Sequence, residues 1–142
     1  MHRNQSPKLR SGGNITTASF VKVSTAAPNT CLQAGANEQV IGISQQGTKY
    51  PQGLLGVSNT YAAEAADEID LNGLGDITRL RAGSGGFTKG LNIKSDANGD
   101  GVLVATSGTT IQYVGAIALE DAAEGELGQV QIIFMAIRPA LS

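Results

Sequence analysis

The sequence has few charged side chains, few aromatic rings and a single cysteine. Charged residues make up 15% of the 142 residues, against about a quarter of a typical soluble chain. The surface must therefore be completed by Ser, Thr, Asn, Gln and Gly or be covered by a partner, and we expect partial covering. Because Cys31 stands alone, an internal disulfide framework is excluded. With aromatic residues at 4% and no Trp, stacking platforms for sugars or bases would have very few rings.

The charge balance and the lack of long apolar runs argue against two classes of partner. A net charge of −2 provides no basic field for nucleic acid or for an anionic membrane surface. No apolar run approaches the length of a membrane-spanning helix, and no apolar stretch of a secretory signal follows the basic N-terminus. We expect no direct nucleic-acid partner, no membrane partner, and folding in the cytoplasm of the cell that makes the protein.

The chain does contain 41% apolar residues and 19 glycines, which indicate a packed core and many tight turns. Short β-branched runs of about four to nine residues alternate with Gly-rich turn clusters. The runs lie at residues 20–23, 40–44, 54–58, 77–80, 91–94, 102–106, 111–119 and 130–137. Strands this short at this spacing predict an all-β fold, a small single-domain β-barrel or sandwich over residues 18–142.

Three glycines and one Ala-rich segment refine this prediction. Gly42, Gly56 and Gly115 each interrupt an apolar run, which predicts bulges, bends or close backbone approach. Strands that bend in this way favour a closed barrel over a flat sheet. The Ala-rich residues 61–68 permit at most one short helix, because they span barely two turns.

An internal echo links two parts of the chain. At residues 54–69 and again at residues 113–127, a strand-like run with a central Gly ends in an acidic, Ala-containing turn that leads to a further apolar segment. We interpret this echo as a duplicated strand–turn–strand unit. Chance similarity in a biased composition is the alternative.

Residues 1–17 are polar and rich in turn-forming residues, and they predict an extended N-terminal arm that becomes ordered only against another surface. The arm carries Arg3, Lys8 and Arg10 without a compensating acid. We expect it to lie on an acidic surface of a neighbouring chain, either a partner protein or the acidic residues 64–70 of a sister subunit. A chain without the arm should then fold with nearly unchanged thermal stability.

The sharpest motif is the loop Asp-Ala-Asn-Gly-Asp-Gly at residues 96–101, which matches positions one, three, five and six of an EF-hand calcium loop. The twelfth position is Ser107, so the bidentate carboxylate that closes the coordination sphere is missing. We expect a β-turn, with weak calcium binding as the alternative. The Gly-rich residues 83–90 fail the phosphate-loop pattern, because Thr88 precedes Lys89 and a strand follows.

Side chains for catalysis are scarce. His2 is the only histidine and lies in the arm, and Cys31 has no second histidine to activate it. The acidic groups at residues 64–68 and 124–126 lack the aromatic neighbours that would hold a sugar. We interpret them as solvated turns or as partners for a basic surface. The sequence thus predicts no enzyme, no catalytic residue, no cofactor and no metal site.

The last strand-like run, residues 130–137, is apolar on both of its faces. Alternation along a strand places Ile132, Phe134 and Ala136 on one side and Ile133, Met135 and Ile137 on the other. Such a strand predicts one face in the barrel and one face against a partner. The candidate contacts with a partner or a sister subunit are therefore Arg3, Lys8, Arg10, Ile133 and Met135.

The second half of the chain has a definite order of segments. A loop and short strand at residues 90–95 lead into the Asp-Ala-Asn-Gly turn, followed by a strand, the Tyr-Val-Gly-Ala-Ile run at residues 113–117, an acidic Ala/Gly turn and the final apolar strand. This order resembles that of the capsid decoration, or cement, proteins of tailed phages, and residues 54–69 look like a first copy of the unit. The resemblance covers residues 53–137. The longer loop at residues 83–86 and the basic arm depart from it.

The resemblance implies a non-enzymatic structural protein of the virion. Such a protein is a β-barrel, often a homotrimer, that assembles in the host cytoplasm on the outer surface of the capsid and clamps neighbouring major capsid proteins. A modest interface repeated at many sites suits this role, because each contact gains from the fixed geometry of its neighbours. The alternative is a phage tail or baseplate β-domain, or a receptor- or glycan-binding β-domain. The scarcity of aromatic side chains argues against glycan binding.

Overall fold

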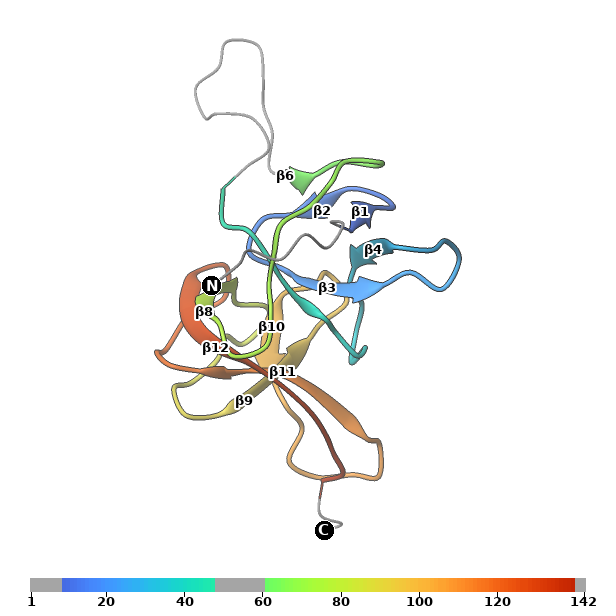
Figure 1. The fold of residues 1–142 in the computed structure, drawn as a ribbon. Coiled ribbons are helices and arrows are strands. Elements are labelled where there is room, and N and C mark those ends of the chain that lie inside the picture. The colour runs from blue at the N-terminus through green and yellow to red at the C-terminus, as the bar shows by residue number, and fades with distance from the viewer. Residues whose placement is uncertain (1–8, 48–60, 140–142) are drawn as a thin grey trace, which may run out of the picture.

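The computed structural model describes residues 9–47 and 61–139, and within them the chain forms twelve strands and no helix (Figure 1). The strands are β1 (Arg10–Ser11), β2 (Ile15–Thr16), β3 (Phe20–Val23), β4 (Thr30–Gln33), β5 (Gly42–Ser44), β6 (Tyr61–Ala63), β7 (Leu71–Asn72), β8 (Ile77–Arg81), β9 (Asn92–Ser95), β10 (Gly101–Leu103), β11 (Gln112–Ala118) and β12 (Leu127–Ile137). The predicted all-β fold is confirmed. In this part of the chain no helix could cross a membrane.

The strands form two five-stranded sheets and one short pair. The N-terminal sheet has the order β1-β4-β3-β5-β7, the C-terminal sheet has the order β10-β9-β11-β12-β8, and β2 pairs with β6. Strands β1 and β4 are parallel, and the other paired strands are antiparallel. Figure 1 shows the blue N-terminal strands on one side of the molecule and the yellow-to-red C-terminal strands on the other.

The C-terminal sheet curls until its two edge strands meet. Ala82, directly after β8, forms a parallel bridge with Gly101 of β10, and the Gly83 N–H donates to the Gly101 carbonyl at 2.8 Å. Gly101 has room for no side chain, because a Cβ there would lie 2.5 Å from Leu80 Cδ2 and 2.9 Å from Ile93 Cγ2. The apolar side chains of β8 and β9 thus fill the inside of the curl directly behind its seam.

Strand β3 carries one core on each face of the N-terminal sheet. Phe20 belongs to a cluster shared with the C-terminal sheet, and Val21, one residue on, belongs to a second cluster on the opposite face. The first cluster consists of Phe20, Ala34, Val40, Ile43, Leu80, Ala82, Phe87, Ile93, Ala116, Ala118, Ala122, Val130 and Ile132. The second consists of Ile15, Val21, Cys31, Ala63 and Ile69. Because both faces are covered, β3 is the central strand of the whole domain.

Two of the three predicted strand glycines have the expected role. At Gly115 the pairing of β11 with β12 shifts register, and a Cβ there would lie 2.6 Å from Phe20 Cε1 and 2.8 Å from Val40 Cγ2. At Gly42 a Cβ would overlap the carbonyl oxygen of Asn72 on the neighbouring strand. The predicted bulge is thus confirmed at Gly115 and the predicted close approach of backbones at Gly42. Gly56 lies outside the described residues.

The sequence missed five short strands and permitted a helix that does not form. Residues 61–63 are β6, paired with β2, and a turn follows at residues 64–67. Strands β1, β2, β4, β6 and β7 have two to four residues each, too few to display an alternating pattern. They form because neighbouring strands supply their hydrogen bonds, which is a tertiary effect. The predicted run at residues 54–58 lies outside the described residues.

The predicted arm is wrong for residues 9–17, which are part of the domain. Ser11 and Ile15 are buried, β1 pairs with β4, and β2 pairs with β6. The Ser11 N–H donates to the carbonyl oxygen of Asp67 at 2.7 Å, and the Ala66 N–H donates to the carbonyl oxygen of Ser11 at 2.7 Å. The acidic residues 64–70 therefore lie beside residues 9–17 of the same chain, whereas the sequence predicted a contact with a neighbouring chain. The sequence did not show this packing, because the segment has few apolar residues and is held by backbone hydrogen bonds together with the single buried apolar side chain of Ile15.

A chain that begins at Ala18 should therefore be strongly destabilised. It loses the fully buried Ile15 side chain and exposes Cys31 and Ala63, and the loss of one large apolar core side chain alone costs about 2–5 kcal/mol. Thermal unfolding followed by circular dichroism measures the effect. A chain that begins at Leu9 is the control and should melt near the full-length protein. Equal melting temperatures for all three would show that residues 9–17 do not contribute to the core.

Gly115→Ala should destabilise the domain by about 1–3 kcal/mol, the usual cost of overpacking. The added methyl group would meet the Phe20 ring and Val40, both held within the core. Gly73→Ala is the matched control, because a Cβ at Gly73 meets nothing within 4 Å. Urea unfolding of both variants gives the comparison. An unchanged midpoint for Gly115→Ala would mean that the close approach at the bulge does not constrain the fold.

Candidate functional site

The beginning of β11 and the end of β12 project from the curled sheet as a two-stranded ribbon without charge. We call residues 112–114 and 133–137 the neutral ribbon; Gln112 pairs with Ile137, and Val114 pairs with Met135. The sequence has no Asp, Glu, Lys or Arg from residue 102 to 119 or from residue 127 to 137. Figure 1 shows β12 running from the body of the domain toward the C-terminal end of the chain.

The neutral ribbon exposes apolar side chains on both faces. Met135 is 44% exposed and Phe134 is 38% exposed, whereas Ile133 and Ile137 are half-buried. The sequence predicted one of the two alternating sets of residues 132–137 in the core and left open which set, but of these six residues only Ile132 is buried. Among the described residues β8 pairs with β12 only as far as Gln131, so the end of β12 has a neighbouring strand on its β11 side alone. The prediction that part of this strand awaits a partner stays a prediction.

Two hollows flank the neutral ribbon. One, of about 330 Å³, is lined mainly by apolar residues: Leu91, Asn92, Leu103, Val104, Ala105, Thr106, Ile137 and Pro139. The other, of about 110 Å³, lies where residues 39–40 approach Tyr113, Val114 and residues 134–136. The walls of the first hollow are mainly apolar and carry no charged side chain, so this hollow can accept an apolar group.

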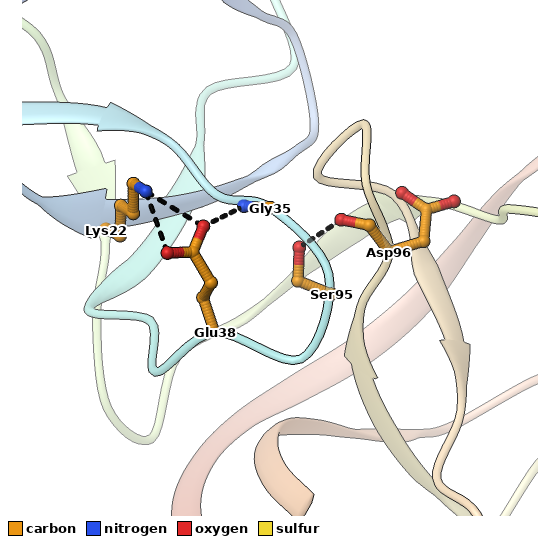
Figure 2. A network of polar contacts seen from close by, with 5 residues as sticks. All are labelled: Lys22, Gly35, Glu38, Ser95 and Asp96. Carbon is orange, nitrogen blue, oxygen red and sulfur yellow. Dashed lines mark hydrogen bonds and ion pairs between the residues drawn. The ribbon is translucent and has the colours of Figure 1, made fainter.

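A third hollow, of about 560 Å³, has an ion pair at its rim. Lys22 Nζ lies 2.8 Å from Glu38 Oε2, and Figure 2 shows the same carboxylate receiving the Gly35 N–H, at 2.6 Å. The hydrogen bond from Lys22 lowers the pKa of Glu38, with a smaller contribution from the Gly35 N–H. Both partners of the carboxylate are structural, so this ion pair fixes the turn at residues 35–38.

The loop at residues 96–101 is a backbone turn that joins the two sheets. Asp96 Oδ1 accepts the Asn98 N–H at 2.8 Å and the Asp100 N–H at 2.9 Å. The Gly99 carbonyl accepts the Phe20 N–H at 2.8 Å, which connects the loop to the central strand. Figure 2 shows Asp96 beside Ser95, whose hydroxyl donates to the Asp96 carbonyl at 3.0 Å. The β-turn interpretation is confirmed, because Asp96 binds the backbone of its own loop.

Asp100 is the titratable group of this loop with an unusual environment. Burial raises the pKa of Asp100 to about 6, the nearby Asp96 carboxylate adds to the shift, and Arg81 opposes it. Arg81 is held on the other side of the seam, where its guanidinium donates to the Thr17 carbonyl at 3.0 Å. Asp100 therefore changes charge in the mildly acidic range, at the seam of the curled sheet.

The acidic side chains cap turns. At least seven of the twelve accept a hydrogen bond from a backbone N–H: Glu38, Asp67, Asp76, Asp96, Glu120, Asp121 and Glu126. In four turns, at residues 35–38, 64–67, 73–76 and 123–126, the fourth residue accepts from the first, and the third has a positive φ. The echo seen in the sequence includes two of these turns. Shared turn chemistry is enough to explain that part of the echo.

The other candidate residues are scattered. Arg10 is exposed on β1, whereas Arg3 and Lys8 lie outside the described residues. Cys31 is buried in the second core cluster, and burial raises the pKa of its thiol. Within residues 9–47 and 61–139, no three His, Cys, Asp or Glu side chains are grouped to hold a metal ion. The neutral ribbon is therefore the surface feature with the clearest potential function.

Comparison with known proteins gives a match in fold. No protein-family model and no curated protein matches the chain. A solved structure described as the head fiber gp8.5 N base in bacteriophage phi29 has a similar fold, with a TM-score of 0.58 and 18% sequence identity. The alignment covers 89% of this chain and 91% of that chain. At this identity the similarity shows a shared fold.

Asp100→Asn should remove a pH dependence of stability. An acid whose pKa is raised to about 6 in the folded state stabilises the fold most below its ordinary pKa, and this stabilisation is lost as the pH rises through about 6. The free energy of unfolding of the variant should rise relative to that of the wild type between about pH 4 and 6. Above about pH 7 the difference between the two should stay constant. Urea midpoints from pH 4 to 7.5 measure this, with the exposed Glu124→Gln as control. Parallel curves for Asp100→Asn and the wild type would contradict the assignment.

Proposed function

We propose that the protein is a structural protein of a phage virion, bound to the outer surface of the assembled capsid, where it stabilises the shell by clamping neighbouring major capsid proteins. The observation that carries this proposal is the fold shared with the base of a phage head fiber over 89% of the chain. The sequence resemblance to capsid decoration proteins supports the same location. Two different kinds of similarity thus point to the phage head.

The neutral ribbon is the proposed contact with the shell or with a sister subunit. It exposes Phe134 and Met135 in a chain with few charges, and apolar groups that gather at one end of a small domain are typically covered in the working assembly. Ile133 lies beside them, half-buried. These side chains would gain free energy from burial wherever the ribbon docks, without the cost of desolvating a charge.

The proposal includes a homo-oligomer, with the trimer that the resemblance implies, and a role for the basic N-terminal residues. Three ribbons on one assembly would bind the shell together, which raises the apparent affinity without any new contact. Arg3, Lys8 and Arg10 would approach an acidic patch of the major capsid protein, so binding should weaken as salt rises.

The alternative, a tail, baseplate or receptor-binding β-domain, rests on the same all-β fold. The solved structure with the similar fold belongs to a phage head rather than to a tail. Copy number per particle separates the two, because a shell protein is present in many more copies than a tail protein.

Met135→Asp should weaken binding to purified shells about tenfold or more, because burying an unpaired carboxylate in an apolar contact costs at least 1.4 kcal/mol. Ile133→Asp is a second variant at the same surface. Leu74→Asp is the matched control, since Leu74 is 69% exposed on a turn that is not part of the ribbon. Co-sedimentation with shells that lack the protein gives the bound fraction, and circular dichroism checks folding. Equal binding of the ribbon variants and the control would overturn the proposed contact.

A further inference from the structure

The outer edge of β12 has no neighbouring strand at its C-terminal end. Strand β8 pairs with β12 from Leu127 to Gln131. At Ile132 the edge is still occupied, because its N–H donates to the Asp76 carbonyl at 2.9 Å and its carbonyl accepts the Gly75 N–H at 2.8 Å. In the described part of the chain, no strand pairs with this edge over residues 133–137.

The backbone groups that point to this open edge belong to Phe134 and Ala136. The Tyr113 N–H donates to the Asn37 side chain at 3.1 Å, so it points away from β12. Tyr113 and its partner Ala136 are therefore a non-hydrogen-bonded pair of the β11–β12 ladder. Because backbone groups alternate in direction along a strand, the N–H and C=O groups of Met135 point toward β11. Those of Phe134 and Ala136 then point to the open edge of β12. Ile132, two residues before Phe134, faces the same side, as its bonds to residues 75–76 require.

The outward N–H and C=O groups, together with the side chains beside them, fit a partner strand without charged side chains. Two N–H donors and two C=O acceptors, spaced two residues apart on an exposed strand, match the backbone of another strand. The side chains beside them are apolar on both faces, and residues 127–137 contain no charge. Natural edges of this kind are often protected by a charged side chain such as Lys, by Pro or by a bulge. Residues 133–137 contain no charge and no Pro, the register of β11 and β12 shifts between Met135 and Ile132, and Arg138 is the first charged residue after the edge.

We propose that this edge pairs with the same edge of a second copy of the chain, antiparallel and centred on Met135. In that register Phe134 of one copy lies opposite Ala136 of the other, so all four outward groups of each copy find partners. The paired segment is residues 133–137 of each copy, because residues 75–76 already occupy the edge at Ile132. A parallel arrangement in register would place two Arg138 side chains together. The contact is twofold and self-complementary. This pairing goes beyond the proposed function, because it needs no capsid shell. It would also join two copies of the chain by a contact separate from that of a trimer.

A cysteine at the centre of the pairing tests the register. Two Met135 residues would form a non-hydrogen-bonded pair with Cα atoms about 4.5 Å apart, a separation that a disulfide can bridge. Met135→Cys, treated with the thiol oxidant diamide, should give a covalent dimer in high yield from purified protein alone. Val23→Cys, 53% exposed at another strand, is the control, and the native Cys31 is buried. If the two variants cross-link equally, the proposed pairing is wrong.

A proline at the edge tests the backbone hydrogen bonds. Adding Ala136→Pro to Met135→Cys removes only an outward N–H, and an edge strand tolerates proline there. Cross-linking should fall at least tenfold, whereas Ala136→Val, which keeps the N–H, should leave it unchanged. Circular dichroism verifies the fold, and Phe134→Lys, which protects the edge by charge, serves if the proline variant unfolds. Undiminished cross-linking in the proline or lysine variant would overturn the proposal.

Discussion

The contact between the Phe20 ring and the bare backbone at Gly115 determines how the two halves of the chain meet. The ring belongs to the core shared by both sheets, and the register shift in β11 brings the backbone to within contact of it. The main chain of Phe20 is fixed as well: its N–H donates to Gly99 at 2.8 Å, and its carbonyl accepts the Ala34 N–H at 3.0 Å. One residue of β3 therefore joins both sheets and the loop between β9 and β10 through side chain and backbone together.

The scarcity of charge follows a consistent pattern across the molecule. At least seven of the twelve carboxylates accept backbone N–H groups, most of them in turns, where such a cap contributes about 0.5–2 kcal/mol. Strands β10 and β11 and the end of β12 are left without any charge. Short turns are thus stabilised by acids, while one end of the domain keeps an apolar surface suitable for assembly.

The neutral ribbon has two distinct ways to engage a partner. Its faces offer apolar side chains such as Met135, which suit a shell or a sister subunit, and its edge offers the outward N–H and C=O groups of Phe134 and Ala136. Face contacts gain from buried area, whereas edge contacts gain from hydrogen bonds in a fixed register. The two interactions use different atoms, so a single strand end can serve both in one assembly.

Composition and local pattern were sufficient to predict the all-β fold, the roles of Gly42 and Gly115 and the turn at residues 96–101, because turn chemistry and β-branched runs act over a few residues. Only the tertiary structure decided that residues 9–17 belong to the domain and that Phe134 is exposed. Strands of two residues take their stability from distant partners, and the exposure of a strand face depends on where the neighbouring strand ends. Here β8 ends its pairing at Gln131, a long-range fact that the alternation of apolar residues in β12 does not contain.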